Sequence, residues 1–284
     1  MKKTVITLDS TPAAPDCASW HGLRVYGLQL ECPIPSGERF YGHHLRGVLG
    51  RALFDTVCLY ARQGGHDTAC AGCTLQTRCA YPQAFKPVAA DRLPPYWLHG
   101  WHIVEDRLQY HWFMLEAALP HLEAWLYGLQ RHWQQHQGGT LRVGNVGHDV
   151  PVFAGRTLRL DALTPISPPA IPSATCHLHT ITPLISKHGG DPLYGPLRTR
   201  LQRLIQLYGD GTRLPIEQQP WVCSTVTQQP VTLNLPGRVW RGHHYRLHLS
   251  HITESARSLL QWGQYLHAGG HATAGCGAFR LVQD

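Results

Sequence analysis

The segment from Arg39 to Arg46, RFYGHHLR, places two adjacent histidines between two arginines. An imidazole can take up or give a proton near neutral pH, and a guanidinium can neutralise a phosphate. Cleavage of RNA by its own 2′-hydroxyl needs these groups: a base, an acid and cations for the transition state. His43 and His44 follow each other at a predicted helix start, so they point about 100° apart and at most one faces a phosphate well. A solvated or capping histidine pair is an equally good interpretation in a chain with 20 histidines.

Basic side chains also lie on predicted strands. Arg24 belongs to the first strand, and a later strand carries three arginines with two histidines between them. Bases or phosphates that cross a sheet face would meet such side chains, although a basic solvated edge explains them equally well. The candidate catalytic residues are His44, His43, Arg39, Arg24 and Arg241. The candidate RNA-binding residues from the helix and the later strand are Arg46, Arg238, His243, His244 and Arg246.

A glycine-rich stretch, GGHATAGCG, follows the last predicted helix. Glycines allow a backbone to approach phosphates closely and to adopt a positive φ, and two side chains of this stretch add polar donors. The alternative is an ordinary turn between a helix and a strand. The RNA-binding candidates of this stretch are Gly269, Gly270, His271, Thr273, Gly275 and Gly277.

Three cysteines, Cys70, Cys73 and Cys79, cluster in a polar, glycine-rich segment, and Cys58 lies twelve residues upstream. A C-x2-C pair can chelate one ion, and a nearby third cysteine strengthens the pattern. The five-residue spacing before Cys79 departs from the usual zinc pattern of two C-x2-C pairs. A structural zinc ion held by these four cysteines is the preferred interpretation. An iron–sulfur cluster and free thiols are the alternatives.

The composition narrows the function classes. The formal net charge is +7, and all but four of the 25 basic residues are arginine, which forks onto phosphates and stacks on bases. The 18 acidic residues are scattered, and no HExxH, GxSxG or Walker-type motif occurs, which argues against two-metal and hydrolase chemistries. No run of 18 apolar residues and no export signal are found, so a cytoplasmic protein with reduced thiols and no membrane partner is expected.

Residue patterns predict the positions of the elements. An alternating strand over 23–31 precedes a helix from Gly42 to about Arg62, a hairpin over 96–116, a helix over 118–136 and a strand over 156–163. The order then repeats with strands at 176–185, 221–228, 239–251 and 278–282 and helices at 194–208 and 253–267, the second helix capped by Thr253.

This repeated order predicts an α+β chain with tandem ferredoxin-like (RRM-like) βαββαβ domains. The N-terminal domain covers 1–163 with a Cys-rich insertion at about 63–95. A Pro-rich linker spans 164–175, and the C-terminal domain covers 176–284 with the glycine-rich loop.

Three blocks of the sequence resemble CRISPR-associated RAMP-superfamily endoribonucleases that process precursor CRISPR RNA, the sixth Cas protein family. The last block, LLQWGQYLHAGGHATAGCGAFRL at 259–281, is similar to that family's helix, glycine loop and final strand. The block ITPLISKHGGDPLYGPLRTRLQRLIQLYG at 181–209 is similar to its threonine-proline and basic helix. The segments GHHLRGVLGRAL and CAGCTLQTRCAYPQAF resemble its cysteine-bearing, type IV-like members.

The resemblance implies an endoribonuclease that cuts CRISPR repeat RNA at a stem-loop without a catalytic metal or other cofactor. It implies products with 5′-hydroxyl and 2′,3′-cyclic phosphate ends and retention of the mature crRNA. Other Cas effector subunits are expected as partners. The alternative is a catalytically silent crRNA-binding subunit of a CRISPR ribonucleoprotein.

Overall fold

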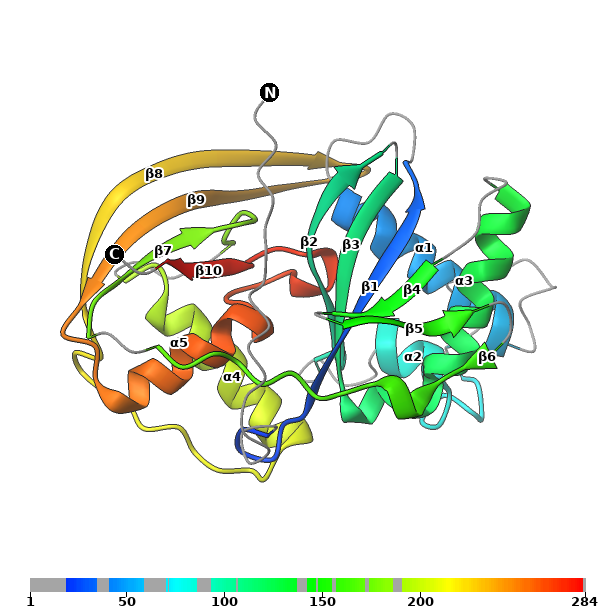
Figure 1. Cartoon of the computed structure of the whole chain (residues 1–284), viewed down its shortest axis with the longest axis horizontal. Helices are drawn as coiled ribbons and strands as arrows, with labels where there is room; N and C mark the ends of the chain where they lie inside the picture. Colours follow the sequence, from blue (N-terminus) through cyan, green and yellow to red (C-terminus); the bar gives the residue numbers. More distant parts are fainter. Residues whose placement is uncertain are drawn as a thin grey trace.

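The computed structural model describes eleven stretches of the chain, which form two antiparallel sheets with helices packed against them (Figure 1). The structure describes residues 19–34, 41–58, 70, 72–85, 93–105, 107–136, 142–146, 148–154, 157–171, 174–185 and 191–282.

The N-terminal half forms a six-stranded sheet in the order β2-β3-β1-β4-β5-β6. Its elements are β1 (Val25–Pro33), α1 (Tyr41–Val57), α2 (Ala80–Phe85), β2 (Tyr96–Val104), β3 (Arg107–Leu115), η3 (Glu116–His121), α3 (Leu122–His136), β4 (Arg142–Asn145), β5 (His148–Ala154), β6 (Thr157–Leu158) and η4 (Leu160–Ala162). The order of the first four strands, with β1 between β3 and β4, is that of a ferredoxin-like sheet, which confirms the predicted fold for this half.

The strand predicted at 156–163 to complete this sheet is wrong. The strand that pairs with β1 is β4, which was not predicted and which matches Val143 with Leu30. Only Thr157–Leu158 of the predicted segment is a strand, and it extends the sheet edge beside β5. Four residues with one buried apolar side chain give no alternating pattern, so pairing with a distant strand decides this element. The short helix α2 was also not predicted.

The C-terminal half repeats the arrangement, with the strand order β10-β7-β9-β8, and confirms the tandem architecture. Its elements are β7 (Cys176–Thr180), α4 (Tyr194–Tyr208), β8 (Val222–Leu235), β9 (Arg238–Ser250), α5 (Glu254–Leu266), η5 (Ala272–Ala274) and β10 (Phe279–Val282). Strand β7 is shorter and β8 is longer than predicted. As expected, Thr253 caps α5, because its Oγ1 accepts a hydrogen bond from the Ala256 amide.

Strands β8 and β9 form a long ribbon that arches from the C-terminal half toward the upper end of β2 and β3 (Figure 1). Neighbouring strands β7 and β10 have only five and four residues, so most of the ribbon has no further strand beside it. Its tip at Leu235 packs with Trp240 and Trp101 in a small apolar cluster. The ribbon thus bridges the two halves.

Two large apolar cores use opposite faces of the N-terminal sheet. One core, which includes Leu28, Leu98 and Trp112, lies beneath α1 and α3. The other joins Trp97 and Phe113 of the same sheet to the C-terminal helices, including Leu201 of α4 and Leu260 of α5. A sheet buried on both faces explains why β2 reads as an almost continuous apolar run.

The segment between the two halves follows the start of β1. The Ile166 amide donates to the Val25 carbonyl at 2.7 Å, and Pro165 forms a bridge with Tyr26.

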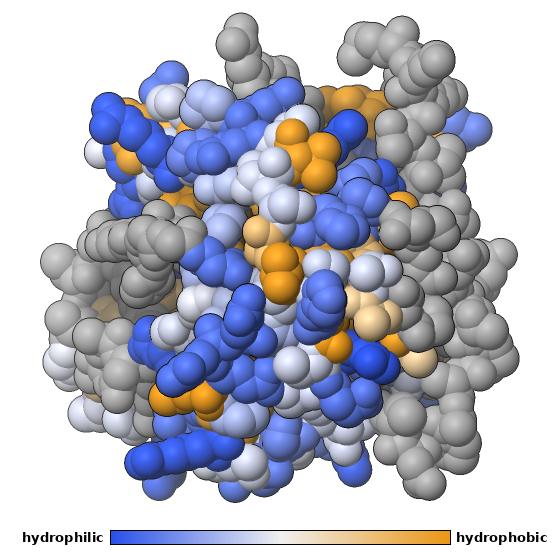
Figure 2. Space-filling view, turned by 90° about the vertical axis from the view of Figure 1, so that its left-hand side faces the viewer, coloured by the Kyte–Doolittle hydropathy of each residue, from blue (hydrophilic) through white to orange (hydrophobic). Residues whose placement is uncertain are grey.

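None of the helices in the described part of the chain combines the length and apolar character needed to cross a bilayer. The outer face of the C-terminal half, which lies at the left in Figure 1, is mainly hydrophilic, with separate hydrophobic spots (Figure 2).

Helix α1 begins in close contact with the glycine-rich loop because Gly42 has no side chain. A Cβ atom at Gly42 would overlap the carbonyl oxygen of Ala274 and would lie 2.9 Å from the Trp101 ring. Gly47, on the same helix, has open space where its Cβ would stand.

We therefore predict opposite effects for the same substitution at these two glycines. Gly42→Ala should lower the free energy of unfolding by about 1–3 kcal/mol, because backbone atoms of the loop must move. Gly47→Ala should raise it by up to about 1 kcal/mol through better helix propensity. Urea unfolding of the two variants measures both changes. Equal stabilities would contradict the close packing at Gly42.

Candidate nucleic-acid interface

The start of α1 and the glycine-rich loop, which are about 230 residues apart in sequence, meet where the two halves join. Besides the contact of Gly42 with Ala274, Arg46 Nε donates to Thr273 Oγ1 at 3.2 Å. The Arg46 guanidinium also lies 5.5 Å from the centre of the Phe85 ring. Residues proposed separately for proton transfer and for phosphate binding are therefore brought into one site.

Trp240 joins the two histidines of this site. The His271 ring stacks on Trp240 with centroids 4.0 Å apart and planes 19° apart. The His43 ring meets Trp240 edge-on, at 5.8 Å and 88°. Because β9 carries Trp240, the long ribbon fixes where both imidazoles lie. His43 comes from α1 and His271 from the loop, so the pair exists only when the two halves are packed together.

His44 differs from His43 in its surroundings. Its side chain is half-buried, and its Nε2 atom lies out of contact with solvent. On the helix it stands next to the buried side chain of Leu45. Of the two adjacent histidines, His43 is therefore the one that shares a cluster with Trp240 and His271.

The glycine-rich loop is held by backbone hydrogen bonds, both within itself and to the segment 183–185. The amides of Gly270, Gly275 and Gly277 donate to the carbonyls of Ile185, Ala272 and Pro183 at 3.1, 2.8 and 2.9 Å. Gly277 has a φ of +77°, and a Cβ atom there would overlap the Ala268 carbonyl. These three amides are not available to phosphates without breaking protein hydrogen bonds. The predicted binding of phosphates by the loop therefore depends less on these amides than on the side chains of His271 and Thr273.

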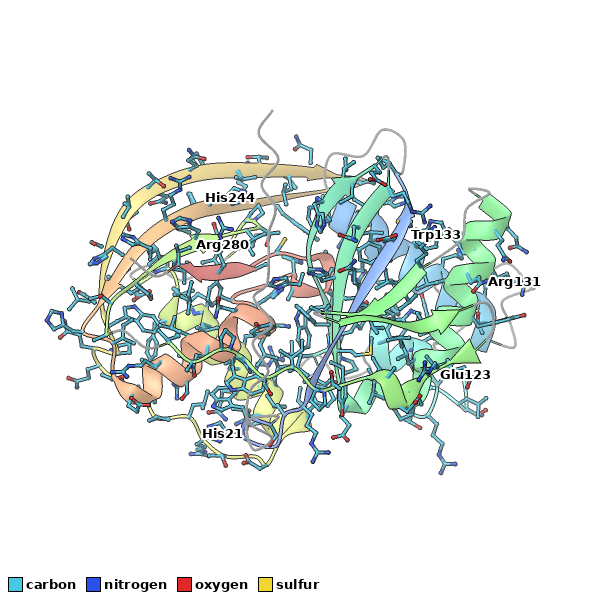
Figure 3. All side chains as sticks on the ribbon, in the orientation of Figure 1. His21, Glu123, Arg131, Trp133, His244 and Arg280 are labelled. Atoms are coloured by element: carbon cyan, nitrogen blue, oxygen red, sulfur yellow. The ribbon has the colours of Figure 1, made fainter. Side chains whose placement is uncertain are left out.

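The basic residues of β9 divide between the surface and the sheet. Arg238, Arg241 and Arg246 are exposed along the ribbon. His243 pairs through its backbone with Leu184, with hydrogen bonds of 2.9 and 3.1 Å. His244 has a ring nitrogen 3.3 Å from Thr180 Oγ1, and burial lowers its pKa. His244 and Arg280 lie on the C-terminal sheet, at the opposite end of the molecule from α3, which carries Arg131 (Figure 3).

One of the arginines proposed for catalysis, Arg24, is not part of this junction. Arg24 precedes β1, whereas α1 follows the other end of that strand, about 30 Å away along nine residues. Arg24 Nη1 forms an ion pair with Glu116 Oε1 at 3.3 Å, and both side chains are about half exposed. The structure thus places Arg24 apart from the junction, and its catalytic role stays a prediction. Arg39 lies outside the described residues.

Sequence reasoning missed the two tryptophans that organise the junction. Trp101 lies against both Gly42 and Gly275, and the Trp240 ring contacts the rings of His43 and His271. The signal for Trp240 was its place between Arg238 and Arg241, where a single large aromatic residue interrupts basic residues. Its burial shows that it faces the loop, while Arg241 next to it points to solvent.

Solved structures share this fold at low sequence identity. A partial Cas6-RT-Cas1–Cas2 complex aligns with 10% identity and a TM-score of 0.53, over 93% of this chain and 46% of the other. The Cas6-RT-Cas1–Cas2 complex aligns equally well, over 29% of its chain. Thermus thermophilus Cas6 aligns with 11% identity and a TM-score of 0.49, over 92% of this chain and 99% of the other.

Comparisons of the sequence find one family model, which covers part of the chain. A family model described as AF_1859_N, N-terminal domain, matches residues 29–100. No curated protein sequence matches the chain. The two structural likenesses with TM-scores above 0.5 show that the chain shares its fold with part of these Cas6-RT-Cas1–Cas2 complexes, in agreement with the resemblance drawn from the motifs.

The cysteine segment packs at the far end of α1. Cys58 directly follows this helix, Cys70 is buried, and Cys79 precedes α2. Burial raises the pKa of the Cys79 thiol, and Cys58 and Cys73 lie close enough to raise it further. Within the described stretches, no three Cys, His, Asp or Glu side chains are grouped closely enough to hold a metal ion. The zinc prediction therefore rests on the spacing of the cysteines and not on an assembled ligand set.

We keep the zinc prediction because it has a direct test. If Cys58, Cys70, Cys73 and Cys79 hold a structural zinc ion, protein purified without added metal should contain about one zinc per chain. Cys73→Ser should lose it, and Cys223→Ser, which removes a cysteine on β8, should retain it. Elemental analysis showing neither zinc nor iron in the unmodified protein would mean that the four residues are free thiols.

Proposed function

We propose that this protein binds CRISPR repeat RNA and cuts it by attack of an RNA 2′-hydroxyl, as a metal-independent endoribonuclease that then retains the mature crRNA. The observation that carries the proposal is the junction of α1 with the glycine-rich loop, where His43 and His271 meet on Trp240 beside Arg46. The motif resemblance and the Cas6-like fold support the choice of RNA.

The chemistry assigns complementary roles to the residues of the junction. A base removes the proton of the 2′-hydroxyl, the oxygen attacks the adjacent phosphorus, and an acid protonates the departing 5′-oxygen. His43 and His271 approach Trp240 from different elements, so one can serve each proton transfer. Arg46, whose Nε is held by Thr273, is the nearest cation of the cluster for the negative charge of the transition state.

The exposed side of the β8–β9 ribbon supplies further contacts to the RNA. Arg238 and Arg241 flank Trp240 on β9, Arg246 lies further along the same strand, and all three are exposed and can neutralise phosphates of the flanking RNA. The complexes with similar folds contain Cas1 and Cas2, and we propose that this chain too works with other Cas subunits.

A crRNA-binding subunit without activity is the second candidate. It is favoured by the packing of both imidazoles against Trp240, because aromatic contacts restrict the motion that proton transfer needs. The two candidates share the binding surface and differ only in whether the bound RNA is cut.

The first prediction for this function concerns the nucleophile. Purified protein should cut its host's own CRISPR repeat RNA equally well with and without a chelator, leaving a 2′,3′-cyclic phosphate. A single 2′-deoxy substitution just 5′ of the cut should abolish cleavage and leave binding within about twofold, because it removes only the attacking group. Normal cleavage of the deoxy substrate would exclude the mechanism. Binding of the unmodified repeat without cutting would favour the silent subunit.

The second prediction concerns the proton carriers. His43→Ala and His271→Ala should each lower the single-turnover cleavage rate by about 10²–10⁴-fold, with a smaller change in RNA affinity. His132→Ala is a matched control, since His132 also meets a tryptophan edge-on, with centroids 5.7 Å apart, but lies on α3. His44→Ala should have less effect than His43→Ala. Wild-type rates in both the His43 and His271 variants would shift the chemistry to Arg46 and Arg241.

A further inference from the structure

Two buried histidines join the halves of the protein beneath the glycine-rich loop. His99 lies on β2 and His267 directly follows α5, and their side chains are almost completely buried. His99 Nδ1 is 2.9 Å from His267 Nε2, and His267 Nδ1 is 3.0 Å from the carbonyl oxygen of Cys276 inside the loop. Neither histidine belongs to the cluster around Trp240.

The carbonyl determines the tautomers of both rings. Because a carbonyl oxygen only accepts, His267 Nδ1 must carry a hydrogen. In a neutral ring its Nε2 is then an acceptor, so His99 Nδ1 must donate to it. The pair therefore forms a directed chain of hydrogen bonds from β2 through His267 to the loop.

The backbone at His267 shows that this side chain has a specific role. Its φ is 64° and its ψ is 166°, a region that is almost confined to glycine. A strained conformation of this kind persists only where surrounding contacts hold it. Both ring nitrogens of His267 make hydrogen bonds, and the backbone amides of His267 and Ala268 donate to the carbonyls of Gly263 and Gly277 at 2.8 and 3.0 Å, so side-chain and backbone contacts together hold this conformation.

The surroundings keep the pair neutral. Burial lowers the pKa of His99 to about 3 and that of His267 well below its usual value. The buried Arg200 on α4 donates through Nε to the Leu266 carbonyl at 2.6 Å and disfavours a second positive charge on His267. The other titratable groups packed around the pair are His111 on β3, His102 on β2, Tyr265 on α5 and Cys276 in the loop.

We propose that His99 and His267 act as a positioning latch, in which two neutral imidazoles hold the glycine-rich loop against β2 and thereby place His271 and Thr273. The loop carries these residues only a few positions from Cys276, the residue that the latch holds. The part of this inference that concerns RNA rests on the proposed function. The part that concerns the loop does not.

The tautomers provide a spectroscopic test. In long-range ¹H–¹⁵N spectra of the imidazole rings, both histidines should be neutral Nδ1–H tautomers, and their shifts should not titrate between pH 5 and pH 8. Resonances are assigned with the His99→Asn and His267→Asn variants. An Nε2–H tautomer at His267, or titration of either ring in this range, would overturn the latch.

Variants at His99 test what the latch does. His99→Leu removes the donor, and His99→Asn retains an N–H near the position of Nδ1. We expect His99→Leu to increase amide exchange of Cys276 and Gly277 by at least about tenfold, with α3 unchanged, and His99→Asn to restore most of the protection. The affinity for the repeat RNA should fall by about tenfold in His99→Leu and recover in His99→Asn.

The two readouts separate the two proposals. Exchange is measured without RNA, so unchanged loop protection in His99→Leu would overturn the latch whatever happens to RNA binding. Equal loss of protection in both variants would also overturn it, because packing volume and not the hydrogen bond would then matter. Wild-type protein that binds no repeat RNA would contradict the proposed function, while the exchange results would still decide the latch.

Discussion

Strand β2 packs on both of its faces, and the rest of the structure depends on this double burial. Tyr96 and Leu98 close the core under α1 and α3, whereas Trp97 faces the C-terminal helices. Three side chains of β2 contact the C-terminal half. Trp97 Nε1 donates to the Tyr265 carbonyl at 2.5 Å, His99 forms a hydrogen bond with His267, and Trp101 contacts the glycine-rich loop. One strand thus fixes the end of α5 and the loop that follows it.

This arrangement explains why the chain uses histidines in two different ways. His99 and His267 are buried, and the contact between them and the Cys276 carbonyl give hydrogen-bond partners to His99 Nδ1 and to both ring nitrogens of His267. His43 and His271 lie against Trp240 at the edge of the same junction. Histidine content alone does not distinguish a structural imidazole from a candidate proton carrier. The distinction comes from the surroundings of each ring, which are a buried polar contact for His99 and His267 and an aromatic contact with Trp240 for His43 and His271.

The two ferredoxin-like halves contribute different elements to the candidate site. The N-terminal half supplies the start of α1 and the supporting tryptophan of β2, and the C-terminal half supplies the loop and the β8–β9 ribbon. Because the ribbon extends beyond β7 and β10, its exposed arginines reach outward while Trp240 turns inward. A substitution that loosens the packing of the halves would therefore disturb all parts of the candidate site together.

The sequence by itself determined the repeated βαββαβ order, because helical and alternating apolar patterns are local, and it singled out both α1 and the glycine-rich loop through residue chemistry. It did not reveal β4, whose four residues become a strand only by pairing with β1. It placed Arg24 with the catalytic candidates, although pairing with Glu116 holds it at the far end of β1. Only tertiary structure decided that His43 meets Trp240 and that His99 and His267 bind each other, because contacts between residues 168 or more positions apart depend on how the two halves pack.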